Sequence, residues 1–165
     1  MTAKRCFPPV VDAQTRVLVL GSLPGEVSLA QNQYYANKQN RFWFLLGEII
    51  GRDLPGMDYP TRLQTLLQHH IGLWDVVAEA QRVGSLDSNI RDHASNALQG
   101  LVDSLPRLAA IAFNGGTAAK LGSRALAASA GRHQWLALPS SSPAYTIPYA
   151  DKLRAWQALR VWLAD

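Results

Sequence analysis

The hydrophobic positions of this 165-residue chain fall into two kinds of segment, short apolar runs and longer stretches with helical spacing. Residues 15–20 carry the run Val-Leu-Val-Leu directly before a Gly-Ser-Leu-Pro-Gly turn, the pattern of a buried parallel strand that ends at a glycine loop. Comparable short runs occupy residues 71–74, 108–113 and 135–138. The pattern therefore predicts four strands, each followed by a polar loop.

Segments with an apolar residue every three to four positions separate these strands and predict helices. The segment 40–51 begins with Asn40, which can cap a helix, and ends with Gly51, a residue typical of helix ends. Further helices are predicted over residues 59–68, 94–104, 117–128 and 149–164. Strands that alternate with helices predict an α/β fold of three layers, α/β/α, around a central, mainly parallel four-stranded sheet.

The remaining polar stretch, residues 81–96, is long and rich in turn formers, and we interpret it as a loop over the rim of the sheet. The length suits one domain over residues 1–165, since domains run to roughly 100–200 residues. No internal repeat or domain boundary is visible along the chain.

Composition narrows the classes of protein that fit. A hydrophobic content of 48% and a charged content of 17% are typical of a folded globular protein. No apolar run approaches the roughly 20 residues of a membrane span, and the basic start lacks the apolar stretch of a secretory signal. We therefore expect a cytoplasmic protein without a membrane segment. Its net charge of +4 mildly favours a partner that carries phosphate.

Cysteine and histidine usage indicates neither a metal site nor a cofactor. Cys6 is the single cysteine, which excludes an intramolecular disulfide and a cysteine-ligated iron–sulfur cluster. Two of the four histidines, His69 and His70, are adjacent, and His93 and His133 stand alone. These spacings do not match metal-ligand patterns.

Two loops of small residues are the first candidates for a ligand site, because ligands bind at the carboxyl ends of parallel strands. They are Gly21-Ser22-Leu23-Pro24-Gly25 and Leu138-Pro139-Ser140-Ser141-Ser142-Pro143-Ala144. Asp75 and Asn114 stand at the ends of the other two strands. We expect all four strand ends to share one pocket. Purely structural roles are also open, since glycine and proline occur in most turns, Asp75 can cap a helix and Asn114 suits a tight turn.

The segment 33–43 mixes aromatics, amides and cations without the period of a buried helix or strand, which suits a flat polar ligand such as a nucleobase. Tyr35 lies in a polar stretch and can stack on a planar ring, whereas Phe42 and Trp43 are expected in the core. Lys38 and Arg41 can contact phosphate or be solvated surface charges.

Taken together, these blocks resemble the uracil-DNA glycosylase superfamily, and most closely its DNA-deoxyinosine (hypoxanthine-DNA) glycosylase branch. The turn 21–25 looks like the first motif of the superfamily. Residues 35–43 look like the segment written Phe-Ala-His-Pro-x-Asn-Arg-Phe-Trp in the mismatch-specific uracil glycosylases, with Lys38 in place of the proline. The loop 138–144 matches the second motif. Shorter blocks similar to the deoxyinosine branch lie at 71–76, 84–88 and 112–115.

Two departures from the pattern bear on the chemistry. Ser22 stands where several relatives carry an aspartate or asparagine that activates water, and a serine is too weak an acid or base to replace a carboxylate. Leu138 stands where the strongest uracil enzymes carry a histidine. The resemblance instead assigns the catalytic asparagine to Asn40, with Ser22 beside it in the catalytic site.

The resemblance implies a monofunctional DNA glycosylase that flips a deaminated base, favouring hypoxanthine, out of DNA and hydrolyses its glycosidic bond. We expect a monomer that needs no cofactor. The predicted base-binding residues are Gly21, Leu23, Pro24, Gly25, Tyr35, Asp75 and Asn114. The predicted DNA-binding residues are Pro139, Ser140, Ser141, Ser142, Pro143, Lys38 and Arg41.

Three alternative functions are compatible with the residues. The first is a mismatch-specific uracil-DNA glycosylase, and the second is a non-catalytic α/β module that binds nucleic acid. The third is a small serine hydrolase that pairs Ser22 or one of Ser140 to Ser142 with His133, although no Gly-x-Ser-x-Gly motif supports it.

Overall fold

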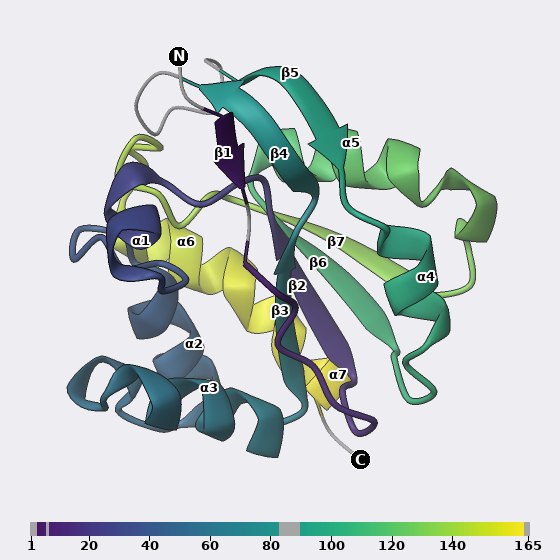
Figure 1. The fold of residues 1–165 in the computed structure, drawn as a ribbon. Coiled ribbons are helices and arrows are strands. Elements are labelled where there is room, and N and C mark those ends of the chain that lie inside the picture. Colours follow the sequence, from purple (N-terminus) through teal and green to yellow (C-terminus); the bar gives the residue numbers. More distant parts are fainter. Residues whose placement is uncertain (1–2, 6, 83–89, 164–165) are drawn as a thin grey trace.

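A four-stranded parallel sheet forms the centre of the protein, which we describe from a computed structural model that covers residues 3–5, 7–82 and 90–163. The strand order is β3-β2-β6-β7, and every neighbouring pair is parallel (Figure 1). The bounds are Val17–Gly21 for β2, Ile71–Asp75 for β3, Ala110–Asn114 for β6 and Gln134–Leu138 for β7. All four strands were predicted from their apolar runs, and the sheet confirms them.

Helices cover both faces of this sheet because successive side chains of a strand point to opposite sides. Val17 and Val19 share a core with the helices α2, α3 and α6, whereas Leu18 and Leu20 pack with α4 and α5 on the other face (Figure 1). The helices are α1 Glu26–Gln31, α2 Phe42–Ile50, α3 Tyr59–Gln68, α4 Leu98–Asp103, α5 Gly116–Ala125, α6 Tyr149–Trp156 and α7 Arg160–Leu163, with 3-10 turns at Leu54–Gly56, Ala127–Ser129 and Gln157–Leu159. The predicted three-layer α/β/α fold is confirmed.

A second, antiparallel sheet was not predicted. Its strands are β1 Ala3–Arg5, β4 Val77–Arg82 and β5 Ile90–Ser95, in the order β1-β4-β5. The interpretation of residues 81–96 as a loop is therefore wrong for both ends of that segment, and its 84–88 block lies outside the described residues. Pairing of the backbones defines these strands, and the polar sequence carries no apolar alternation that could have indicated them.

The helix prediction needs correction at three places. The helix predicted from residue 94 begins only at Leu98, because β5 continues to Ser95. The last helix is interrupted by a 3-10 turn at Gln157–Leu159. Helix α1 was not predicted, because it has only six residues, too few for a periodic pattern.

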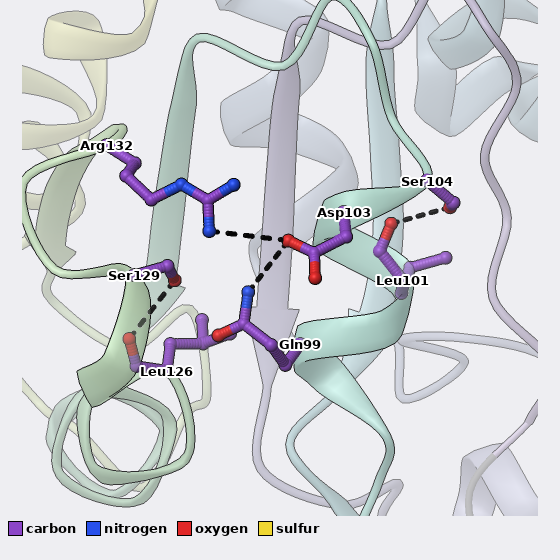
Figure 2. Close-up of polar contacts among 7 residues, drawn as sticks. All are labelled: Gln99, Leu101, Asp103, Ser104, Leu126, Ser129 and Arg132. Carbon is purple, nitrogen blue, oxygen red and sulfur yellow. Dashed lines mark hydrogen bonds and ion pairs between the residues drawn. The ribbon is translucent and has the colours of Figure 1, made fainter.

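Polar contacts at the opposite edge of the sheet from the strand ends connect α4 to the segment before β7 (Figure 2). The Asp103 carboxylate accepts a hydrogen bond from Gln99 Nε2 at 2.9 Å and lies 3.6 Å from an Arg132 guanidinium nitrogen. Both partners of this ion pair are well exposed, so it contributes about 0–1 kcal/mol. This edge carries structural contacts, and the candidate site lies at the other one.

Candidate functional site

The carboxyl ends of the four parallel strands open into a pocket of about 370 Å³. The turn 21–25 follows β2, Asp75 and Asn114 end β3 and β6, and the loop 140–145 follows β7; all of them line the pocket. The segment before α2 adds Tyr35 and Asn40. Ser22 and Ser141 therefore face the same pocket, as the single-pocket prediction requires.

Gly21 brings the backbone of β2 against two candidate functional side chains. The strand register pairs Gly21 with Asp75, whose side chain is buried at 3% exposure. A Cβ atom at position 21 would lie 2.6 Å from Asp75 Oδ1 and 2.8 Å from the Tyr35 hydroxyl. Only glycine fits this approach, and it gathers a carboxylate and a phenol at one point of the pocket.

Tyr35 is held in an orientation that its sequence position does not reveal. Its φ of 54° lies in the left-handed region, and its ring stacks on Phe42 with centroids 3.7 Å apart and planes at 13°. The indole nitrogen of Trp43 donates to the Tyr35 carbonyl at 3.2 Å. One face of the tyrosine ring is therefore occupied by Phe42, and the hydroxyl reaches toward Gly21.

Asn40 combines a structural contact with a place in the pocket wall. Its Oδ1 accepts a hydrogen bond from the backbone N–H of Phe42 at 3.0 Å, at the start of α2. Arg41 occupies the N-cap position itself, so Asn40 supports the helix from one residue further out. Among the described residues, Asn40 Nδ2 makes no hydrogen bond. The helix contact therefore orients the amide and leaves its two N–H donors for another partner.

Asn114 and Ser141 form a buried, reciprocal pair. Asn114 Nδ2 donates to Ser141 Oγ at 2.9 Å, and the Ser141 backbone N–H donates to Asn114 Oδ1 at 2.9 Å. Asn114 is 7% exposed and Ser141 is not exposed at all. Although both line the pocket, their polar atoms serve each other. The sequence predicted a base contact for Asn114 and a DNA contact for Ser141. This geometry instead favours a structural role for the pair, which is to hold the loop in place.

Replacing Ser141 with alanine is expected to lower the free energy of unfolding by about 1–3 kcal/mol, because Asn114 Nδ2 then loses its buried acceptor. Urea denaturation measures the change. Ser123 offers a matched control, since its exposed hydroxyl only bonds the carbonyl of Lys120 in its own helix, and Ser123→Ala should change the free energy by less than about 0.5 kcal/mol. Equal effects of the two substitutions would contradict the structural role of the Asn114–Ser141 pair.

Helix α6 holds the same loop from behind. Lys152 Nζ donates to the Ser142 carbonyl at 3.0 Å, and Trp156 Nε1 donates to the Pro139 carbonyl at 2.9 Å. The Arg41 backbone N–H adds a bond to the Ser141 carbonyl at 3.0 Å. Burial, with a smaller contribution from the Arg41 charge, lowers the pKa of Lys152. The serine-proline loop, residues 139–143, is thus held at the carbonyls of Pro139, Ser141 and Ser142.

The other predicted residues are placed as follows. Ser22, Leu23 and Pro24 are buried in the pocket wall, and Gly25 is half-buried there. Lys38 is exposed and does not line the pocket, Pro139 lies behind its wall, and Arg41 lines a neighbouring groove. The lining residues outside the predicted base-binding and DNA-binding sets are Val27, Ser28, Tyr34, Asn37, Ala144 and Tyr145. Val27 and Ser28 lie in helix α1, and Ala144 and Tyr145 lie in the loop after β7.

Neither metal ligands nor a membrane span were found in the part of the chain that the structure describes. Within that part, no group of three or more His, Cys, Asp or Glu side chains is placed to hold a metal ion. None of its helices is long and apolar enough to cross a membrane.

Comparisons with known proteins agree with this geometry. The family model of the uracil DNA glycosylase superfamily matches residues 8–164. Proteins named hypoxanthine DNA glycosylase from Methanosarcina barkeri and Methanosarcina acetivorans are each 47% identical over 112 residues, which is 68% of this chain and 71% of theirs. The solution NMR structure of a candidate uracil DNA glycosylase from Methanosarcina acetivorans superposes with a TM-score of 0.87 at 40% identity, covering 98% of this chain and 99% of that one. The resemblance seen in the sequence blocks is confirmed, and the chain belongs to the uracil DNA glycosylase superfamily.

Proposed function

We propose that this protein is a DNA glycosylase that hydrolyses the N-glycosidic bond of a deaminated base, with hypoxanthine as the favoured base. The observation that carries the proposal is the convergence of Asn40, Asp75 and Tyr35 on one pocket at the strand ends. Membership of the superfamily and the 47% identity to proteins named hypoxanthine DNA glycosylase support it. We further propose that it acts as a cytoplasmic monomer without a cofactor.

The substrate must leave the duplex before it can reach this pocket. Flipping a base costs a few kcal/mol, and a mispaired or damaged base costs less. Deamination also changes the edge that the base presents. Hypoxanthine and uracil carry a ring N–H beside a carbonyl, whereas adenine and cytosine carry an unprotonated ring nitrogen beside an amino group. A pocket that accepts from the ring N–H therefore favours the deaminated base.

Asp75 has the chemistry for this selection. A carboxylate oxygen accepts hydrogen bonds, so Asp75 suits the ring N–H of a deaminated base, whereas adenine N1 offers it no N–H. The Tyr35 hydroxyl lies next to it across Gly21. Rejection of this kind is strong, because the mismatched base leaves buried polar groups without partners.

The chemical step requires a positioned water and stabilisation of an oxocarbenium-like sugar. Asn40 is the residue we assign to the water, since its amide is oriented by Phe42 and its Nδ2 faces no described protein acceptor. No lysine lines the pocket among the described residues, and Lys152 is engaged behind the loop. Hydrolysis to an abasic site without strand cleavage follows from this set of residues.

A panel of duplexes with one lesion each tests the proposal directly. The purified protein is incubated in excess with DNA that carries deoxyinosine, deoxyuridine, deoxyxanthosine or only normal bases, and abasic sites are revealed by alkali. We expect excision of hypoxanthine to be fastest and no excision of adenine. Absence of cleavage in every lesion duplex would favour the non-catalytic nucleic-acid-binding module. Faster excision of uracil than of hypoxanthine would favour the uracil enzyme.

The serine hydrolase alternative finds no support in the placement of its residues. His133 immediately precedes β7, whereas Ser140 lies beyond its other end, so the whole strand and Pro139 separate them. No histidine lines the pocket among the described residues. Ser141, the serine of this loop with a fully buried side chain, is bonded to Asn114.

Replacing Tyr35 with alanine is expected to slow hypoxanthine excision by about 5- to 150-fold, because stacking of one base on an aromatic ring contributes about 1–3 kcal/mol. Single-turnover rates on the deoxyinosine duplex measure the effect. Tyr35→Phe keeps the ring stacked on Phe42 and removes only the hydroxyl, so it measures the contribution of the hydroxyl by itself. We expect it to stay within several-fold of the parent rate, and equal rates for all three forms would argue against stacking.

A further inference from the structure

Arg41 is an exposed cation in the groove next to the pocket, and two aromatic rings hold its side chain in place. Its guanidinium carbon lies 5.4 Å from the centroid of the Phe44 ring and 5.9 Å from that of the Tyr149 ring. Phe44 belongs to α2 and Tyr149 to α6, so two elements fix the one side chain. An arginine held against aromatic faces loses less conformational freedom when its fork of N–H groups binds an anion.

Among the residues that the structure describes, no carboxylate forms an ion pair with Arg41. Glu48, two turns further along the same face of α2, accepts a hydrogen bond from the Tyr149 hydroxyl. Burial and this bond raise the pKa of Tyr149 above its ordinary value, so it stays a neutral donor at physiological pH. Glu48 is thereby held by Tyr149.

The position of Arg41 relative to the pocket is set by the backbone. Its neighbour Asn40 lines the pocket, and its own N–H donates to the Ser141 carbonyl. Lys152 lies buried behind Ser142, close enough for the Arg41 charge to contribute to its lowered pKa. Two positive charges thus flank the serine-proline loop.

We propose that Arg41 binds one phosphate of the DNA backbone beside the flipped nucleotide, and that Phe44 and Tyr149 are the positioning residues that hold its guanidinium for this contact. The proposal rests on the proposed function, because only a DNA substrate brings a phosphodiester to this groove. A guanidinium matches two phosphate oxygens with two parallel N–H groups. A contact of this kind fixes the register of the duplex over the pocket and is independent of base sequence.

The salt dependence of binding separates the charge of Arg41 from its orientation. The dissociation constant is measured at several salt concentrations on a duplex with one 2′-fluoro-deoxyinosine, whose electron-withdrawing fluorine blocks the oxocarbenium-like step. Arg41→Gln is expected to weaken binding about tenfold or more and to reduce the slope of log K against log salt by about 0.9, the value of one phosphate contact. Phe44→Leu keeps the charge, so it should weaken binding a few-fold with an unchanged slope.

Arg52 provides the matched control. It is an exposed arginine just beyond the other end of α2, and it lines the same groove next to the pocket as Arg41. Arg52→Gln should leave both affinity and slope as in the parent. Equal losses of slope for Arg41→Gln and Arg52→Gln would overturn the proposal, since they indicate an effect of net charge. An unchanged slope for Arg41→Gln, or a reduced slope for Phe44→Leu, would overturn it as well.

The parent protein distinguishes failure of this inference from failure of the proposed function. Excision is measured on the same duplex with ordinary deoxyinosine, and thermal denaturation confirms that each variant is folded. If the parent excises hypoxanthine while Arg41→Gln keeps the parent slope, the phosphate contact alone is wrong. If the parent excises nothing and binds lesion and normal duplexes equally, the proposed function fails, and the slope of Arg41→Gln still decides the phosphate contact.

Discussion

Replacing Asn40 with alanine is expected to lower the single-turnover rate of hypoxanthine excision by about 100- to 1,000-fold, the usual cost of losing one positioned polar group. Asn40 is oriented by its bond to Phe42 and lines the pocket. Ser22 lies in the same pocket but is neither acidic nor basic enough to take over. The rate is measured with enzyme in excess over the deoxyinosine duplex.

A second substitution separates the chemistry of Asn40 from its contact with α2. Alanine also removes the acceptor for the Phe42 N–H, which costs about 1 kcal/mol of stability as for a lost helix cap. Asn40→Ser supplies a hydroxyl acceptor for the helix but no amide. We expect Asn40→Ser to melt close to the parent temperature and to show the same rate deficit as Asn40→Ala. Parent-like excision by Asn40→Ser, or loss of excision in Ser22→Ala alone, would reduce Asn40 to a structural role.

The sequence predicts the parallel sheet and α3 well because their signals are local. Each strand of the sheet is an apolar run closed by a turn, and α3 occupies the predicted residues 59–68. Its start is marked by Asp58, which accepts a hydrogen bond from the Thr61 N–H. The strand ends then follow from topology, since parallel strands place their following loops at one edge.

The parts of the site that escaped prediction depend on contacts between distant residues. Asn114 and Ser141 are 27 positions apart, and nothing local indicates that their polar atoms bond each other. A lysine in an amphipathic helix is expected on the surface, yet Lys152 is 3% exposed and its Nζ donates to the Ser142 carbonyl. The antiparallel sheet escaped for the same reason, since its pairing joins residues 3–5 to 77–82.

A series of aromatic contacts connects helix α6 to the pocket. Trp156 is fully buried in α6 and meets the Phe42 ring edge-on, with centroids 5.9 Å apart at 85°. Phe42 in turn stacks on Tyr35. The orientation of Tyr35 at the pocket therefore depends on a tryptophan that lies outside every block by which the sequence identified the site.

Replacing Trp156 with alanine is expected to lower the free energy of unfolding by about 3–5 kcal/mol, as for other large-to-small changes of buried aromatics. Urea denaturation measures the loss. Phe42 can relax into the cavity, so Tyr35 loses its support and excision should fall together with stability. Trp156→Phe keeps most of the packing and loses the bond to the Pro139 carbonyl. It should therefore lower the free energy of unfolding by only about 1 kcal/mol. If Trp156→Ala stayed folded with parent-like excision, the aromatic series would be packing without influence on Tyr35, because Phe42 would then hold the tyrosine ring unaided.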